Sequence, residues 1–195
     1  MVKRLYLDGC SLTYGHGLPR DESLGRLFEV KGFYDVKDMS RPGKSNLLMA
    51  IDTYKNFQDY DTFVIGFTYS ARFGIKYQGQ DLDFYSGFHG QGIEIDQTNI
   101  NAQSISDAYL EVYKYFFTIF EPPYCDDLSD MLIDGLITFL KSQNKKVIAY
   151  SWEQRNTKTG LAYPYIAPKF RLPSGHLNRH GMQYLYDFLQ NLINE

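Results

Sequence analysis

A nearly continuous apolar run at residues 62–67, Thr-Phe-Val-Ile-Gly-Phe, most constrains the fold of this 195-residue chain. Such a run, without polar alternation, is typical of a strand buried on both faces at the centre of a parallel sheet. Similar short strand patterns occur at residues 2–7, 33–36 and 145–151. Helical patterns separate these strands, and this alternation predicts a parallel sheet that is covered by helices.

The helices expected between the strands have apolar residues at helical spacing and candidate N-terminal caps, Asp21 or Ser23 for the first helix and Ser45 or Asn46 for the second. A fifth strand is expected within residues 152–170. The sequence therefore predicts an α/β fold: a three-layer, doubly wound, mainly parallel five-stranded sheet with helices on both faces. The helices are expected at about residues 24–31, 46–54, 106–120, 127–142 and 179–194.

One long stretch, at about residues 74–101, is polar, rich in glycine and aromatic residues, and without a clear period. Loops of this length inside a compact domain tend to be lids or binding loops. The chain contains no repeat, linker or low-complexity segment. We therefore expect a single domain, residues 1–195, with an irregular insertion at about 74–101 that forms one wall or lid of the site.

Composition excludes several classes of function. With 20 basic and 23 acidic residues the net charge is −3, and without a basic block nucleic acid is not an expected partner. The two cysteines, Cys10 and Cys125, indicate neither a disulfide framework nor a zinc site. The longest apolar helical run, residues 131–140, is too short to span a bilayer, and the N-terminus lacks a signal-peptide pattern. We expect a cytoplasmic protein without a metal or organic cofactor.

The first expected strand runs into Gly9-Cys10-Ser11 and then into a glycine-containing loop. Gly9 is expected to adopt backbone angles that are closed to other residues, so that the chain turns sharply and presents the Ser11 hydroxyl. In parallel sheets, functional sites lie at the carboxyl ends of the strands, which is where Ser11 is expected. A serine hydroxyl is a weak nucleophile and needs a base, usually histidine.

Four histidines are available as that base. His176 lies in a loop just before the last expected helix, from where it can point across the sheet edge toward Ser11. His180 is expected on the first turn of that helix, facing elsewhere, while His16 and His89 lie in glycine-rich loops. His176 is the predicted general base, and capping of the helix is its alternative role.

Two of these segments carry a resemblance to a known family. Gly9-Cys-Ser-Leu-Thr13 resembles the first signature block of the SGNH (GDSL-type) hydrolases, whose serine is the nucleophile. Gly175-His-Leu-Asn-x-x-Gly181, followed by an amphipathic helix, resembles the last block, whose histidine is the general base. The resemblance implies the flavodoxin-like SGNH hydrolase fold, with Ser11 and His176 as the catalytic pair. The blocks occur in the family's order, and their variants are similar to those of the divergent branch common in phage and marine microbial genomes.

The two middle blocks imply the donors of an oxyanion hole. Residues 41–46, Arg-Pro-Gly-Lys-Ser-Asn, resemble the second block, whose glycine N–H is a donor, so the resemblance implies Gly43. The third block normally ends the central strand with Gly-x-Asn. Here Thr68 takes the glycine position and Ser70 the asparagine position, so Thr68, Ser70 or Arg72 is expected to substitute as a donor beside the nucleophile's own N–H.

The chain departs from the family at two further positions. The aspartate that usually precedes the histidine by two or three residues is replaced by Ser174 or Pro173. A Ser–His dyad held by a backbone carbonyl, or an acid from elsewhere such as Asp8 or Glu153, would take its place. Cys10 stands where the first block has aspartate, and we interpret it as a buried thiol under the loop, with a nucleophilic role as the alternative.

The resemblance implies a serine esterase that cleaves a small acyl ester, and the aromatic residues, 16% of the chain, suggest an O-acetylated sugar. Two alternatives stay open. The first is a non-catalytic module of the same fold that binds a glycan or acyl ligand, which the missing aspartate and asparagine favour. The second takes residues 11–15 as a phosphate cradle for a flavin after the first strand, which leaves the Gly-His-Leu-Asn segment without a role.

Overall fold

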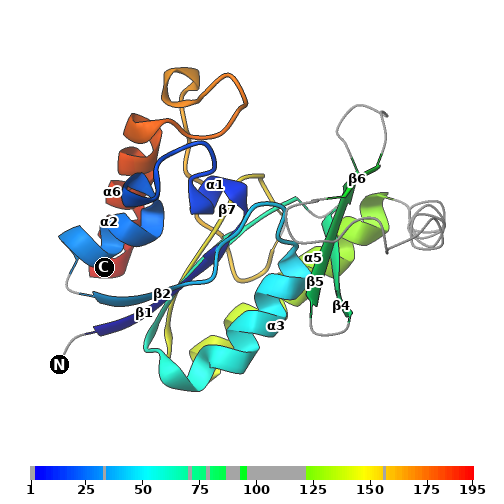
Figure 1. Cartoon of the computed structure of the whole chain (residues 1–195). Coiled ribbons are helices and arrows are strands. Elements are labelled where there is room, and N and C mark those ends of the chain that lie inside the picture. The colour runs from blue at the N-terminus through cyan, green and yellow to red at the C-terminus, as the bar shows by residue number, and fades with distance from the viewer. Residues whose placement is uncertain are drawn as a thin grey trace.

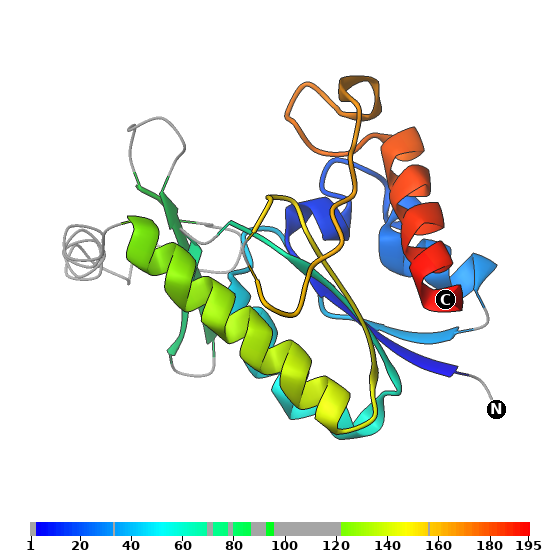
Figure 2. The same cartoon turned by 180° about the vertical axis from the view of Figure 1, so that it is seen from behind.

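Four parallel strands form the main sheet: β1 (Lys3–Gly9), β2 (Tyr34–Asp38), β3 (Thr62–Phe67) and β7 (Lys146–Ser151), in the order β2-β1-β3-β7. Helices α2 (Leu24–Lys31) and α6 (Arg179–Asn194) cover one face, and α3 (Asn46–Asn56) and α5 (Pro122–Ser142) cover the other (Figures 1 and 2). Shorter elements are α1 (Ser11–Tyr14) and the 3-10 turns η1 (Arg20–Glu22), η2 (Phe57–Asp59) and η4 (Pro168–Phe170). This computed structural model describes residues 3–32, 34–69, 72–77, 80–86, 93–95, 122–155 and 157–195.

The predicted α/β fold, with a parallel sheet and helices on both faces, is confirmed, but the predicted count of five strands is wrong. The described part of the main sheet has four strands. In place of the fifth, a single residue, Ala162, bridges to Tyr150 of β7 in parallel orientation. Ala162 accepts a hydrogen bond from Ser151 N and donates one to Ala149 O, both at 3.0 Å. Among the described residues this pairing goes no further, which agrees with Pro164 nearby, because proline has no N–H to donate.

The stretch that we expected to be irregular, about residues 74–101, contains strands. A second, antiparallel sheet has the order β4-β5-β6, and in it Phe73 is paired with Phe84 and Ile75 with Leu82. Apolar residues alternate in both strands, Phe73, Ile75 and Tyr77 in one and Leu82 and Phe84 in the other, and the sequence analysis missed this period of two. The strands of this sheet are β4 (Arg72–Tyr77), β5 (Gln80–Ser86) and β6 (Ile93–Ile95). Residues 87–92 and 96–101, and the helix expected at 106–120, lie outside the described residues.

Helix starts follow their capping residues closely. The Ser23 hydroxyl accepts a hydrogen bond from Arg26 N at the start of α2, and the Ser45 hydroxyl accepts one from Leu48 N at the start of α3, both at 3.3 Å. Helix α5 begins at Pro122, earlier than the expected residue 127. Proline is tolerated in a first helical turn, because the N–H that it lacks has no partner there.

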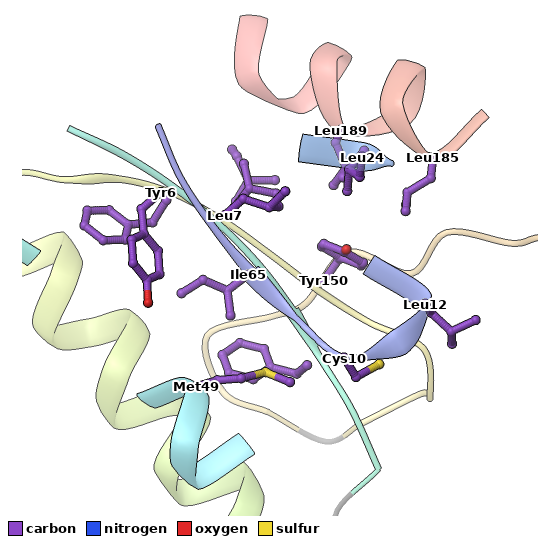
Figure 3. Packing of buried hydrophobic residues seen from close by; sticks show 14 of the residues in the cluster. Tyr6, Leu7, Cys10, Leu12, Leu24, Met49, Ile65, Tyr150, Leu185 and Leu189 are labelled. Atoms are coloured by element: carbon purple, nitrogen blue, oxygen red, sulfur yellow. The ribbon is translucent and has the colours of Figure 1, made fainter. Parts of the chain in front are cut away.

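The two faces of the sheet have separate cores. Leu7 of β1 points toward Leu24 and Leu189 of α2 and α6, whereas Ile65 of β3 points toward the opposite face, where Met49 of α3 lies (Figure 3). All residues of β3 are buried, as the apolar run at 62–67 predicts. Strand β3 is thus the centre of the sheet.

Close packing at the carboxyl ends of β1 and β3 depends on two glycines. Gly9 and Gly66 are register partners on the sheet, and Thr13 of α1 packs against both. A Cβ on Gly9 would overlap the Thr13 side chain, and a Cβ on Gly66 would lie 2.5 Å from the Tyr150 hydroxyl oxygen. Thr13 and Tyr150 are themselves hydrogen-bonded at 2.9 Å. The expectation that Gly9 supplies an unusual backbone angle is therefore wrong, because its φ is not positive: Gly9 is required for space.

Gly9→Ala is expected to lower the free energy of unfolding by about 1–3 kcal/mol, because an added methyl must displace the Thr13 side chain. Gly135→Ala is the control, since a Cβ at this exposed position of α5 has no atom within 4 Å. In a helix this second change is expected to be neutral or to stabilise by up to about 1 kcal/mol. Urea denaturation measures both, and equal midpoints for Gly9→Ala and the wild type would contradict the packing argument.

Candidate active site

Ser11 begins α1 directly after the carboxyl end of β1. Cys10 is the N-cap residue and has extended backbone angles, φ −90° and ψ −164°. The carbonyl of Ser11 accepts hydrogen bonds from Gly15 N at 3.1 Å and from His16 N at 3.0 Å. The turn after α1 therefore folds back onto Ser11 and brings His16 next to it.

His176 lies in a tight loop before α6. The N–H of Leu172 donates to the His176 carbonyl at 2.7 Å, and Gly175 donates to the Leu172 carbonyl at 2.9 Å. Gly175 has a left-handed backbone, φ 83°, which a glycine adopts without strain. His176 Nδ1 and Ser174 Oγ are hydrogen-bonded at 3.2 Å. A hydroxyl thus occupies the position where the sequence pattern leads us to expect an aspartate.

The imidazole of His176 packs against that of His16, with ring centroids 4.9 Å apart. Partial burial lowers the pKa of His176 below its ordinary value, and the nearby side chains of His16, Arg72 and Arg171 lower this pKa further. A histidine with a lowered pKa is neutral at pH 7 and is able to accept a proton.

His16 connects Ser11 and His176, which are far apart in the sequence. Its N–H donates to the Ser11 carbonyl, and its ring contacts the His176 ring. The loop that follows α1 accordingly runs beside the loop that precedes α6 (Figures 1 and 2). No hydrogen bond joins Ser11 and His176 in the structure, where His176 Nδ1 is instead bonded to Ser174.

Gly43 lies in the loop between β2 and α3, next to the Ser11 turn. Arg41 N donates to the Gly9 carbonyl at 3.1 Å, which attaches this loop to the end of β1. Gly43 is buried and has a left-handed backbone, φ 77°, in which other residues are strained. Within the described part of the chain, neither Gly43 N–H nor Ser11 N–H donates a hydrogen bond. Neither N–H is therefore committed to an acceptor in that part of the chain.

Thr68, directly after β3, is fixed by the side chain of Asn46. Thr68 N donates to Asn46 Oδ1 at 2.8 Å, and Asn46 Nδ2 donates to the Thr68 carbonyl at 2.9 Å and to Ser129 Oγ at 2.8 Å. The backbone N–H of Thr68 is therefore already used, while its buried hydroxyl has no hydrogen-bond partner among the described residues. Sequence reasoning treated Asn46 as a possible helix cap and as the last residue of the second block, and missed its bonds to Thr68, which lies 22 residues away.

Arg72, the first residue of β4, lies near the predicted base. Its guanidinium is 5.6 Å from the centre of the Tyr69 ring, and it contributes to the lowered pKa of His176. Ser70, the other expected donor, lies outside the described residues.

Arg155 is a site residue that sequence reasoning missed, since no motif marks it. Its buried guanidinium donates to the Thr68 carbonyl and Ser129 Oγ, each at 3.2 Å, and to Asp130 Oδ1 at 2.5 Å. Glu153, one of the acids considered for His176, lies 3.6 Å from Arg155. Burial raises the pKa of Glu153, and the charge of Arg155 opposes this rise.

Asp8, the other acid considered, is fully buried and bound to Lys44. Lys44 Nζ lies 2.8 Å from both carboxylate oxygens, and Gly9 N donates to one of them at 2.8 Å. Burial raises the pKa of Asp8 to about 7, although Lys44 and Gly9 stabilise the charged form. Because its oxygens are occupied on the α3 side of the sheet, Asp8 does not orient His176.

Cys10 is only 1% exposed and belongs to the hydrophobic core, in keeping with a packing role.

Over the described ranges, no group of three or more His, Cys, Asp or Glu side chains is arranged to hold a metal ion. In the same part of the chain, no helix is both long and apolar enough to cross a membrane.

Comparison with known proteins identifies the fold. No family model matches the chain, and no curated protein matches its sequence. The psychrotrophic esterase EstA from Pseudoalteromonas sp. shares 10% identity with a TM-score of 0.52, over 99% of this chain and 100% of that one. The chain therefore has the α/β fold of that esterase. Two further matches each have a TM-score of 0.41. One is a member of the lipolytic G-D-S-L family from Veillonella parvula, with 10% identity over 99% of both chains. The other is the lipase/acylhydrolase from Enterococcus faecalis, with 14% identity over 97% of this chain and 95% of that one.

Asn46→Ala is expected to lower the free energy of unfolding by about 2 kcal/mol or more, because it leaves the buried N–H of Thr68 without an acceptor. Asn56→Ala on the same helix is the control, since that side chain makes one hydrogen bond, to Asp52 O at 2.7 Å. Its loss is expected to cost about 1 kcal/mol. Equal costs in chemical denaturation would show that Asn46 does not hold Thr68 as described.

Proposed function

We propose that this protein is a serine esterase of the SGNH type, of the divergent branch that its motifs resemble. The observation that carries the proposal is the meeting of the Ser11 turn and the His176 loop through His16, at the carboxyl edge of the sheet. The fold shared with an esterase is consistent with it but does not decide the activity, because one fold supports many functions.

In the proposed mechanism, Ser11 Oγ attacks the carbonyl carbon of an ester while His176 accepts the hydroxyl proton. Because Nδ1 is bonded to Ser174, Nε2 is the nitrogen that takes this proton. His176 then gives the proton to the leaving alcohol, and an acyl group remains on Ser11. Water, deprotonated by His176, releases this acyl group as a carboxylic acid and restores the serine.

The negative charge that develops on the carbonyl oxygen needs donors in place before the reaction. We assign this role to the backbone N–H groups of Ser11 and Gly43, which make no other hydrogen bond among the described residues. The unpartnered hydroxyl of Thr68 is a further candidate, together with Ser70. Arg72, beside Tyr69 and His176, would contact the substrate.

The substrate that we propose is a small acyl ester, with an O-acetylated sugar as the leading candidate. Tyr163 and Tyr165, on the segment between β7 and the His176 loop, are 46% and 71% exposed. Exposed tyrosines offer an apolar ring face and a hydroxyl, a combination that suits sugar rings.

Labelling with a fluorophosphonate probe tests the catalytic pair. The wild type is expected to be labelled, whereas Ser11→Ala and His176→Ala are expected to lose labelling and at least about 1,000-fold in kcat. His180→Ala is the matched control, because His180 lies exposed on α6 and is expected to keep full activity. Labelling that survives either of the first two changes would refute the assignment. Absence of labelling in folded wild type would favour the non-catalytic binding module.

The pH dependence of kcat/KM tests the role of His176. Because the pKa of His176 is lowered, its base form persists below pH 6.5, and activity is expected to fall only as the pH drops through this lowered pKa. Ser174→Asp is expected to move this acid limb to higher pH and to raise kcat by about tenfold, because a carboxylate stabilises the imidazolium better than a hydroxyl. Ser142→Asp, at the end of α5, controls for added charge. An unmoved limb in Ser174→Asp would show that Ser174 does not act on His176.

A further inference from the structure

Lys44, the residue after Gly43, is a completely buried cation. Its ammonium lies 2.8 Å from each oxygen of Asp8 and 2.9 Å from Asp52 Oδ2, and it donates to the Met39 carbonyl at 3.1 Å. The side chains of Lys44 and Asp8 are 1% and 0% exposed. The position is thus a buried cluster of one ammonium and two carboxylates.

The Lys44–Asp8 ion pair joins the two segments that carry the donors of the proposed oxyanion hole. Asp8 is at the end of β1, three residues before Ser11, whereas Lys44 and Met39 belong to the loop that contains Gly43. The same two segments are joined by backbone hydrogen bonds from Met39 N to Leu7 O, at 2.8 Å, and from Arg41 N to Gly9 O. In Figures 1 and 2 this loop passes the carboxyl end of β1 beside α1.

Stability alone is a weak reason for such a cluster. Removing charges from water is costly, and well-packed apolar side chains of similar volume often stabilise a fold as well or better. What an ion pair adds is a defined geometry, because its hydrogen bonds restrict distance and direction together. Here the restricted geometry is that between the Ser11 turn and the Gly43 loop.

We propose that Lys44 is a positioning residue: by binding Asp8 it holds Gly43 N–H at the distance from Ser11 N–H that the oxyanion requires. This inference rests on the proposed esterase function. Lys44 touches neither substrate nor reacting atoms, so its effect is on the placement of a donor. A displacement of about 1 Å in such a donor is able to cost roughly 100-fold in rate.

Lys44→Met keeps the length of the side chain and removes its charge. In this variant kcat and the fluorophosphonate labelling rate of Ser11 are expected to fall by about tenfold or more, with KM within about twofold of the wild type. The acid limb of the pH profile is expected to stay in place, since His176 is unaffected. Hydrogen exchange of the Met39 and Arg41 amides, which bond the Gly43 loop to Leu7 O and Gly9 O, is expected to be at least about tenfold faster when followed by NMR, because the loop opens more readily.

Lys145→Met is the matched control. Lys145 Nζ donates to the Tyr60 carbonyl at 2.8 Å, but this lysine lies at the opposite end of the strands, just before β7. It is expected to leave kcat and both amide exchange rates unchanged. If Lys44→Met fails to fold, the Asp8→Asn variant tests the positioning role instead. Its side chain is isosteric with aspartate, so we expect this variant to fold. We expect it to reduce kcat about threefold and to show the same faster amide exchange.

The two proposals fail differently. If the wild type is not labelled but amide exchange is still faster in Lys44→Met, the proposed esterase activity is refuted, and with it the effect of Lys44 on catalysis. The physical link that Lys44 makes between the two segments would still stand. Labelled wild type with a Lys44→Met variant that behaves like Lys145→Met in both readouts would overturn the positioning role alone.

Discussion

Every parallel strand of the main sheet ends at the same edge, and the loops that meet there leave backbone N–H and C=O groups without ladder partners. In this protein buried polar side chains satisfy several of those groups, and leave the N–H groups of Ser11 and Gly43 without an acceptor among the described residues. Asn46 binds both the N–H and the carbonyl of Thr68, Arg155 binds the same carbonyl, and Lys44 binds the carbonyl of Met39. The geometry of the edge depends on this constraint, because an unpaired buried polar group costs about 1–3 kcal/mol.

One consequence is an asymmetry between the two residues of the proposed catalytic pair. The Ser11 turn is enclosed on one face by Thr13 and Tyr150, which pack over Gly9 and Gly66, and on the other by the Asp8–Lys44 pair. The His176 loop is a more exposed segment, whose side chain is bonded to a hydroxyl. In the proposed pair, Ser11 is thus packed on both sides, whereas the His176 side chain is positioned by one hydrogen bond to a neutral hydroxyl.

The fold was largely predictable from local pattern. The apolar run at 62–67 became the fully buried β3, and the caps of α2 and α3 are Ser23 and Ser45, each one of the two candidates expected for its helix. Errors occurred where a neighbour in space decides the structure. Among the described residues of 152–170, only Ala162 pairs with β7, and the hairpin of β4 and β5 depends on pairing between two segments in which apolar residues alternate with polar residues and glycine.

The sequence by itself determined the positions of the candidate nucleophile and base, because each lies in a short local motif at the end of an expected strand or before an expected helix. Only the tertiary structure decided what surrounds them. Ser174 is the partner of His176, Asp8 is committed to Lys44, and Gly9 is needed to make room for Thr13. Hydrogen bonds, ion pairs and contacts of this kind depend on distances of a few ångströms between segments far apart in the chain, and a linear pattern of residues carries no record of those distances.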